Sequence, residues 1–330
     1  MTNPAPAASA RAVAPVWAVD LMANGTFRPV TEPWPEPAAP ADASWRWLHF
    51  DVADPGLKTW ERQMLPRTAG NALVQQETRP RCEALDDGLI LNLRGVNLNP
   101  GQATDDMVSL RLWVTERCVV SARVRKVFAA EAMRERIETG HVPKDVGSFL
   151  ELLIDELTDR IEAVSVAKDD ETDTLEDKVF DHSGAGFVDV GPLRGSVIKL
   201  RRYVHPQRDA LQKLAMAQVS WLGQHHRPGL MEAADRTTRI VEELDAARDR
   251  LSAMQDHMDT RQAARFGRNS YILSAIAALF LPLGFLTGLF GVNVAGMPGA
   301  DSPMAFWQLT GVCVVIGIAL WLFLRWKRWL

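Results

Sequence analysis

Two long apolar segments near the C-terminal end dominate the pattern of hydrophobic and polar positions. The first, 271–290, contains no charged residue and continues a polar helical stretch that starts near Asp256. The second, 304–324, follows after a turn rich in glycine and proline. Helices of about 20 apolar residues are long enough to cross the hydrocarbon core of a bilayer. The pattern therefore predicts two transmembrane helices joined by a loop at 291–303.

One face of the first predicted span carries small and hydroxyl side chains. Its members recur at alternating spacings of three and four: Asp256, Thr260, Ala263, Gly267, Ser270, Ser274, Ala277, Leu281, Gly284, Gly288 and Gly291. A repeat that averages about 3.5 residues stays on one face of a helix in a left-handed bundle. We call this face the small-residue stripe. It suits either close helix packing or the lining of a pore, and Asp256 favours the pore because packing alone gives no reason for an acid.

Basic residues lie on the same side of both predicted spans. They precede the first span and follow the second, and the turn between the spans has none: Arg261, Arg265, Arg268, Arg325, Lys327 and Arg328. Cytoplasmic loops of membrane proteins are enriched in Lys and Arg. We therefore expect a multi-pass protein of the inner (plasma) membrane with both termini in the cytoplasm, including the basic tail at 325–330, and with the loop 291–303 outside.

Three segments resemble the CorA metal-ion transporter family. Gly291-Val292-Asn293, within GVNVAGMPG, closes the first span where that family usually has Gly-Met-Asn. ETRPRCEALDDGLILNLRGVNLNPG at 77–101 and DDMVSLRLWV at 105–114 extend the similarity over nearly the whole chain after the first forty residues. The Gly-Val-Asn variant resembles the ZntB-like, zinc-transporting branch of the family.

The resemblance implies a funnel-shaped homopentamer that moves divalent cations through an axial pore and requires no cofactor. In this interpretation Gly291, Val292 and Asn293 form the selectivity site at the outer mouth. Asn293 meets the hydrated ion, the small-residue stripe lines the pore, and Asp256 is a second candidate metal-binding residue. Amide and carbonyl oxygens suit Mg²⁺, whereas zinc prefers nitrogen and sulfur. Because the stripe has no His or Cys, the expectation of zinc comes from the resemblance alone. A magnesium, cobalt or nickel channel is the alternative.

Long helices are predicted between the N-terminal region and the membrane. A helical hairpin at 146–222 and a stalk helix at 230–290, which includes the first span, each carry an apolar seam. The seam residues are Leu150, Ile154, Leu157, Ile161 and Val164, then Val197, Leu200, Val204, Leu211 and Leu214, and finally Ile240, Leu244, Ala247, Leu251, Met254 and Met258. These 4-3 repeats predict a coiled stalk, and Pro206 is expected to bend the second helix.

The first helix of this hairpin is acidic. Twelve carboxylates lie between Glu151 and Asp181 against three basic residues. Such a surface is either an ordinary solvated face or, beneath a cation pore, a device that raises the local cation concentration. The sequence leaves both interpretations open.

The N-terminal part predicts a cytoplasmic α/β domain at 15–145 after a largely flexible segment at 1–40, so that the fold class of the whole is α+β. Strands are expected near residues 16–22, 44–52, 88–96, 107–114 and 118–124, the last three as an antiparallel meander. Short helices are expected at 57–63, 71–77 and 128–138. A hairpin dipeptide, Asn24-Gly25, follows the first strand.

Composition and motifs exclude several functions. The net charge of −4 and the pI near 6.0 give no basic surface for nucleic acid. No phosphate-binding glycine motif is present, and no catalytic set converges among His49, Asp51, Asp86, Asp87 and His141, so we expect no enzyme.

The neighbouring histidines His225 and His226 would point about 100° apart on a helix and are expected to lie in a loop. A membrane-anchored sensor with a coiled stalk remains the rival interpretation.

Overall fold

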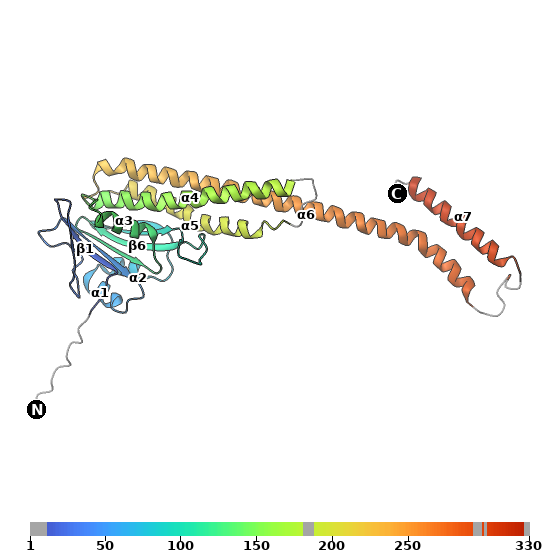
Figure 1. Ribbon diagram of the computed structural model, residues 1–330, viewed down its shortest axis with the longest axis horizontal. Coiled ribbons are helices and arrows are strands. Elements are labelled where there is room, and N and C mark those ends of the chain that lie inside the picture. The colour runs from blue at the N-terminus through green and yellow to red at the C-terminus, as the bar shows by residue number, and fades with distance from the viewer. Residues whose placement is uncertain (1–11, 181–187, 293–298, 300–301, 327–330) are drawn as a thin grey trace, which may run out of the picture. The chain divides into compact units, whose positions relative to one another are not determined.

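The computed structural model describes residues 12–180, 188–292, 299 and 302–326. The chain divides into two units, one extending to Met254 and the other from Gln255 to Leu330. In the first unit a β-sheet is covered by helices on both faces, with α1 and α2 on one side and α3, α4 and α5 on the other (Figure 1). The expected α+β class is therefore confirmed.

Within the described residues, the sheet has seven strands in the order β2-β1-β3-β7-β6-β5-β4. Their bounds are β1 Trp17–Leu21, β2 Phe27–Pro29, β3 Trp45–Asp51, β4 Arg81–Leu85, β5 Gly88–Gly95, β6 Val108–Thr115 and β7 Cys118–Arg123. Strands β5, β6 and β7 form the expected antiparallel meander. Strand β3 joins it in parallel through β7, with His49 opposite Ser121.

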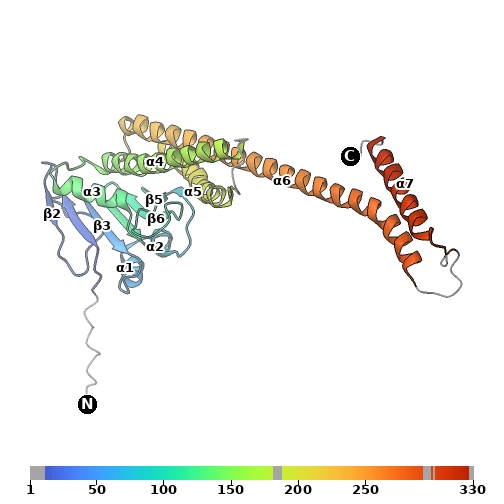
Figure 2. The ribbon, with the colours of Figure 1, turned by 45° about the vertical axis from the view of Figure 1, so that its right-hand side comes forward.

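Alternate side chains of β3 face the two sides of the sheet, as the pleat requires. Trp45 and Trp47 lie against Phe149 of α4, with ring centroids 5.3 and 4.9 Å apart. Phe50 faces the other side and packs on Trp60 of α1 at 4.8 Å. Helices α1 (Leu57–Met64) and α2 (Arg67–Val74) cover that side (Figure 2). Burial on both faces explains why this strand is almost continuously apolar and aromatic.

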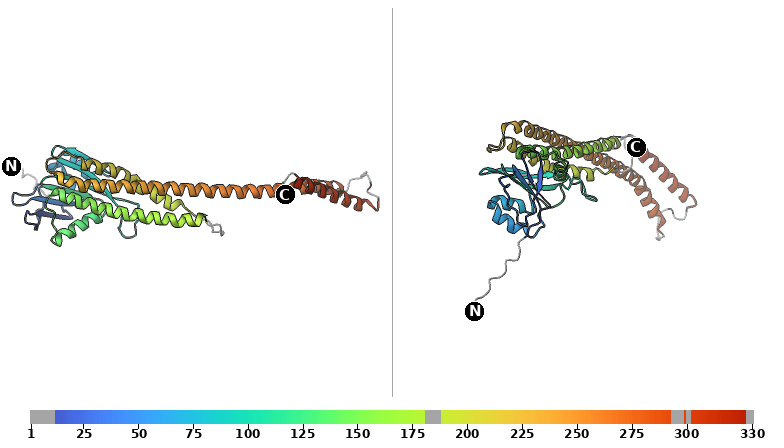
Figure 3. Two further views of the ribbon diagram at one scale, coloured as in Figure 1. Left: turned by 90° about the horizontal axis from the view of Figure 1, so that it is seen from above. Right: turned by 60° about the vertical axis from the view of Figure 1, so that its left-hand side comes forward.

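Three long helices follow α3 (Phe128–Glu138): α4 (Val146–Phe180), α5 (Gly191–Ala215) and α6 (Arg227–Gly291). The first half of α6 runs beside α4 (Figure 3). Helix α5 continues through Pro206, and its predicted seam is buried throughout. The α6 seam is buried from Ile240 to Met254, while Met258 is half-buried.

The seam of α4 differs from the prediction beyond Ile161. Val164 is half-buried, and the buried positions after Ile161 are Ser165, Thr172 and Val179, one heptad apart. A hydroxyl can be buried in a helix when a nearby group accepts its hydrogen bond. The Thr172 hydroxyl, for example, donates to the Lys168 carbonyl at 2.7 Å. A search for apolar repeats therefore missed these buried positions, because two of them are the polar residues Ser165 and Thr172.

Three other local features of the first unit differ from the prediction. The segment expected to be flexible up to residue 40 contributes β1 and β2 and buries Val13 and Leu21 from position 12 onward, whereas 1–11 lie outside the described residues. The helix expected at 71–77 begins earlier, at Arg67, directly after Pro66. His225 and His226, expected in a loop, lie on the 3-10 turn η1 (Gln224–His226) that leads into α6.

In the second unit, α6 continues to Gly291 and α7 spans Ala305–Trp326. Both helices contain a stretch long and apolar enough to cross a membrane, judged by length and composition. Large apolar side chains on these helices are exposed in the single chain, Leu273 by 68% and Leu281 by 77%. A water-soluble surface rarely carries so much contiguous apolar area, so these helices need lipid or neighbouring subunits around them.

Candidate functional site: the small-residue stripe and its surroundings

The small-residue stripe lies on the second half of α6 and is exposed along its length. Every member from Asp256 to Gly291 is exposed in the single chain. The bulky residues beside it are exposed too, Phe280 by 67% and Phe285 by 68%. Exposure alone therefore does not distinguish the small face from the bulky faces. What distinguishes it is chemistry, because only this face combines glycines, hydroxyls and an acid.

The glycines of the stripe are not required by contacts inside the chain. A Cβ atom placed on Gly267, Gly284 or Gly288 would meet nothing within 4 Å among the described atoms. Glycine in a helix interior costs about 1 kcal/mol relative to alanine. Packing among the described residues therefore does not explain why these positions are glycine. The pore-lining role stays a prediction.

The predicted outer mouth is described only in part. Gly291 is the last residue of α6, and Val292 beyond it is 52% exposed. Asn293, the residue expected to meet the ion, lies outside the described residues. The selectivity role of Gly291, Val292 and Asn293 is therefore carried forward as a prediction.

Two arginines of α6, two heptads apart, bind the acidic surface of α4 in the same way. Arg236 lies 2.8 Å from Asp155, and Arg250 lies 3.1 Å from Asp169. Hydrogen bonds with Glu162 and Asp159 raise the pKa of Arg236, and hydrogen bonds with Asp173 and Glu176 do the same for Arg250. The complete partner sets are Asp155, Asp159 and Glu162 for Arg236 and Asp169, Asp173 and Glu176 for Arg250. Six carboxylates of the acidic face of α4 therefore form ion pairs with α6.

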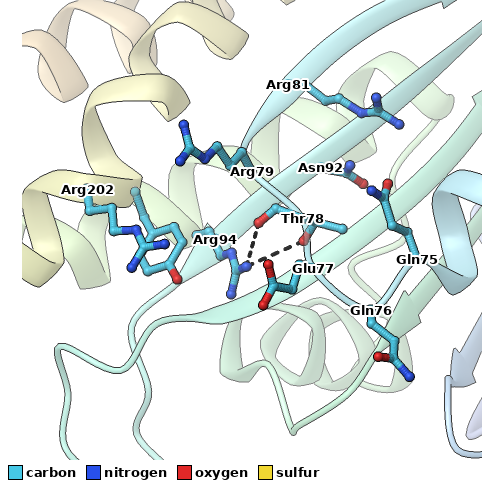
Figure 4. A pocket seen from close by; sticks show the side chains of 10 residues that line it. Gln75, Gln76, Glu77, Thr78, Arg79, Arg81, Asn92, Arg94 and Arg202 are labelled. Atoms are coloured by element: carbon cyan, nitrogen blue, oxygen red, sulfur yellow. Dashed lines mark hydrogen bonds between the residues drawn. The ribbon is translucent and has the colours of Figure 1, made fainter.

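A pocket of about 620 Å³ beside β4 and β5 has a basic lining (Figure 4). Among its lining residues, Glu77 is the only acid. Arg94 donates to the Thr78 carbonyl at 2.6 Å and lies over the Tyr203 ring at 4.4 Å. The arginines that line the pocket are Arg79, Arg81, Arg94 and Arg202. This excess of positive charge repels divalent cations, so the pocket is an unfavourable place for a metal ion.

The groups considered for catalysis do not converge. His49 is buried in the sheet with Nδ1 2.7 Å from the Ser121 hydroxyl, while Asp86 and Asp87 are exposed in the β4–β5 turn. Burial raises the pKa of the Cys82 thiol to about 12 and also raises the pKa of Cys118. Both cysteines therefore remain protonated near neutral pH, and a protonated thiol is a poor nucleophile.

Sequence reasoning missed one cluster of ligating groups, formed by Asp145, His225 and His226. Asp145 lies far from the histidines in the sequence, immediately before α4. The only signal in the sequence was the histidine pair itself, whose side chains would point about 100° apart on a helix.

Comparison with known proteins places these features in a family. The family model described as "CorA-like Mg2+ transporter protein" matches residues 42–328. "Zinc transport protein ZntB" of Pectobacterium carotovorum is 33% identical over 288 residues, covering 86% of this chain and 88% of that protein. "Divalent cation transporter CmaX" of Pseudomonas aeruginosa is 37% identical over 293 residues, covering 86% and 87%. The solved structure of full-length CmaX has a TM-score of 0.79 at 33% identity and covers 98% of this chain and 100% of its own.

Proposed function

The chain belongs to the CorA-like family of divalent metal-ion transporters, and on this premise we propose that it carries zinc through a pore lined by the small-residue stripe of α6. The family match across most of the chain is the observation that supports transport. The stripe supports the route, because it is the face of α6 that offers a hydroxyl-bearing and unobstructed surface. An ion that keeps its water needs room and weak polar contacts more than strong ligands.

Zinc is favoured by the relatives and not by the stripe itself. The Pectobacterium relative is named a zinc transport protein, whereas the Pseudomonas relative is named only for divalent cations. The stripe supplies oxygen ligands and neither His nor Cys, so zinc would pass largely hydrated. The same oxygen chemistry favours Mg²⁺, the ion in the description of the family model. A magnesium, cobalt or nickel channel is therefore the second candidate.

The proposed assembly is a homopentamer in the inner membrane with both termini in the cytoplasm. Five copies would bring five stripes around one axis, which accounts for their exposure in a single chain. The bulky residues of α6 and α7 would then face lipid and each other. Five Asn293 side chains would ring the outer mouth, and five Asp256 side chains would give the inner part of the conduit negative charge.

Zinc flux into liposomes that contain the purified protein tests this proposal. Gly284→Phe would place an aromatic ring from every subunit in the conduit and is expected to abolish flux while the oligomer still assembles. Leu289→Phe is the matched control, because it enlarges a side chain outside the stripe on the same helix and is expected to retain flux. Oligomer size is measured for both variants.

Normal flux in an assembled Gly284→Phe variant would show that the stripe is a packing face. Absence of zinc flux in the wild-type protein, with Mg²⁺ flux present, would favour the magnesium candidate. Absence of all divalent flux would favour the membrane-anchored sensor.

A further inference from the structure

Ligating side chains from two distant parts of the first unit meet where α4 and α6 begin. Asp145 immediately precedes α4, and His225 and His226 form the turn η1 that leads into α6. Each offers one ligand atom, and the three atoms lie within 4.8 Å of one another. The two imidazole rings have centroids 3.9 Å apart. This cluster lies outside the stripe and has no part in the proposed transport route.

The buried member of the cluster, His226, is oriented like a metal ligand. It is 2% exposed, and its Nδ1 lies 2.8 Å from Oε2 of Glu151 on α4. A metal-binding histidine usually donates its second ring N–H to a carboxylate, which fixes the tautomer and leaves the other nitrogen free. Nε2 of His226 is that other nitrogen. It is buried and has no hydrogen-bond partner among the described residues.

One distance within the cluster fits two ligands of a tetrahedral ion. Nε2 of His226 lies 3.2 Å from Oδ1 of Asp145. With Zn²⁺ bond lengths of about 2.0–2.1 Å, two ligands of a tetrahedral site lie about 3.3–3.4 Å apart. If Nδ1 carries the proton, two lone pairs face each other here, and a cation between them would turn this repulsion into coordination. Asp145 and His225 are exposed, so an ion can enter from solvent.

Three glycines make room for this arrangement. A Cβ atom on Gly147 would lie 2.3 Å from the His226 ring, and one on Gly223 would lie 2.6 Å from the His225 ring. A Cβ atom on Gly229 would lie 2.3 Å from Oε1 of Glu151. Real Cβ atoms do not lie this close, so a larger residue at 147 would have to displace the buried His226 ring, whereas the exposed His225 ring and the flexible Glu151 carboxylate could shift aside.

A second arrangement uses part of the same geometry. A protonated His226 could pair with Glu151 and Asp145 together, without an ion. That ion pair gives Nε2 of His226 a partner in Asp145, but it does not explain the convergence of His225. It also gives His225 no function, and this difference separates the two arrangements by experiment.

We propose that Asp145, His225 and His226 bind one Zn²⁺ ion, with Glu151 orienting His226 and with water completing the coordination. Two imidazoles and a carboxylate are ligands that favour zinc over Mg²⁺. The ion joins the segment before α4 to the turn before α6. Its occupancy therefore stabilises the junction from which both stalk helices start.

Cobalt substitution in the purified full-length protein, prepared without a histidine tag, tests the site. Tetrahedral Co²⁺ with nitrogen ligands absorbs visible light much more strongly than hydrated octahedral Co²⁺, so oxygen-lined sites in a pore contribute little signal. We expect strong visible bands that saturate at one Co²⁺ per chain, are abolished by Zn²⁺ and survive an excess of Mg²⁺. His225→Ala and Asp145→Asn are expected to lower Zn²⁺ affinity at least tenfold in a chelator competition.

His205→Ala on α5 is the matched control, because His205 lies outside the cluster, and it is expected to bind like the wild-type protein. His225 is exposed, and asparagine at 145 can still cap α4, so both test variants should fold. Wild-type bands in His225→Ala, or no bands in the wild-type protein, would overturn the proposal. Loss of liposome flux with these bands retained would count against transport alone, and flux without bands would count against this site alone.

Discussion

We expect the entry of ions into the proposed pore to depend most on Asn293. Asn293→Ala removes one direct or water-mediated hydrogen bond per subunit, each worth about 1 kcal/mol, so a ring of five should lose most of its flux. Asn293→Asp would bind a divalent ion more tightly and release it slowly. We expect low zinc flux in both variants and tighter zinc binding only in Asn293→Asp. Wild-type flux in Asn293→Ala would mean that this residue shapes the loop without touching the ion.

His49 should make the stability of the first unit depend on pH. Burial lowers the pKa of its imidazole to about 3, and the charge of Arg123 acts in the same direction. An unfolded histidine titrates near about 6.5, so between these values the unfolded chain binds more protons than the folded chain. The free energy of unfolding therefore falls as the pH drops through this window, by up to about 1.4 kcal/mol per pH unit.

Thermal unfolding of the purified protein between pH 6.5 and about pH 4.5 measures this effect. His49→Gln removes the titrating group, so its unfolding midpoint should fall less steeply with acidification than that of the wild-type protein. His141→Gln, at an exposed position, should follow the wild type. Parallel curves for His49→Gln and the wild type would contradict the assignment.

At the scale of elements, the α4–α6 ion pairs should contribute measurably to stability. Arg250→Gln leaves Asp169, Asp173 and Glu176 facing one another without their shared cation. These groups are more than a third exposed, so solvent screens them and the expected loss is about 1 kcal/mol. The loss should shrink in high salt. Thermal unfolding at low and high ionic strength measures both effects.

Arg248→Gln provides the comparison. Arg248 is on the same helix, but its partners Asp245 and Asp249 belong to α6 itself, so its removal should cost little. An equal loss of stability in the two variants would show that pairing between the helices contributes nothing beyond a surface charge.

Elements with regular apolar patterns could be predicted from the sequence, and those determined by distant partners could not. The strands of the meander β5–β7 are rich in apolar and β-branched residues and were predicted. Strand β4 was missed because, at the edge of the sheet, it buries only Cys82. The parallel pairing of β3 with β7 depends on a contact between segments far apart in sequence. The contact between Asp145 and His226 could not be predicted for the same reason. The histidine pair was wrongly expected to lie in a loop, because its side chains would point apart on an ideal helix.

For the whole molecule, the family and the two apolar helices could be recognised from the C-terminal motif and from span length, since lipid demands long uncharged helices. The pentamer and the orientation in the membrane remain predictions, because a single chain contains no neighbour and no bilayer. The proposed role of the stripe depends on that level of organisation too, since a Cβ atom added at its glycines would meet nothing within 4 Å among the described residues.

The predicted orientation can be tested with single cysteines. In a background that lacks Cys82, Cys118 and Cys313, Ala300→Cys should react with a membrane-impermeant maleimide on intact cells, and Leu330→Cys should react only after the cells are opened. The reason is the asymmetry of Lys and Arg around the spans. Labelling of Leu330→Cys alone on intact cells would reverse the orientation and remove Asn293 from the outer mouth.

The order of charges along α6 also restricts how the stalk can move. Arg236, Glu243 and Arg250 follow one another at one-heptad intervals, and Glu243 lies beside Ser165, 3.4 Å away, between the two sets of acids. Sliding α4 by one heptad in either direction would bring Glu243 opposite a cluster of three carboxylates. Translation of one helix past the other is thus opposed both ways. The pattern of charges therefore favours a stalk in which α4 and α6 keep their register and move together.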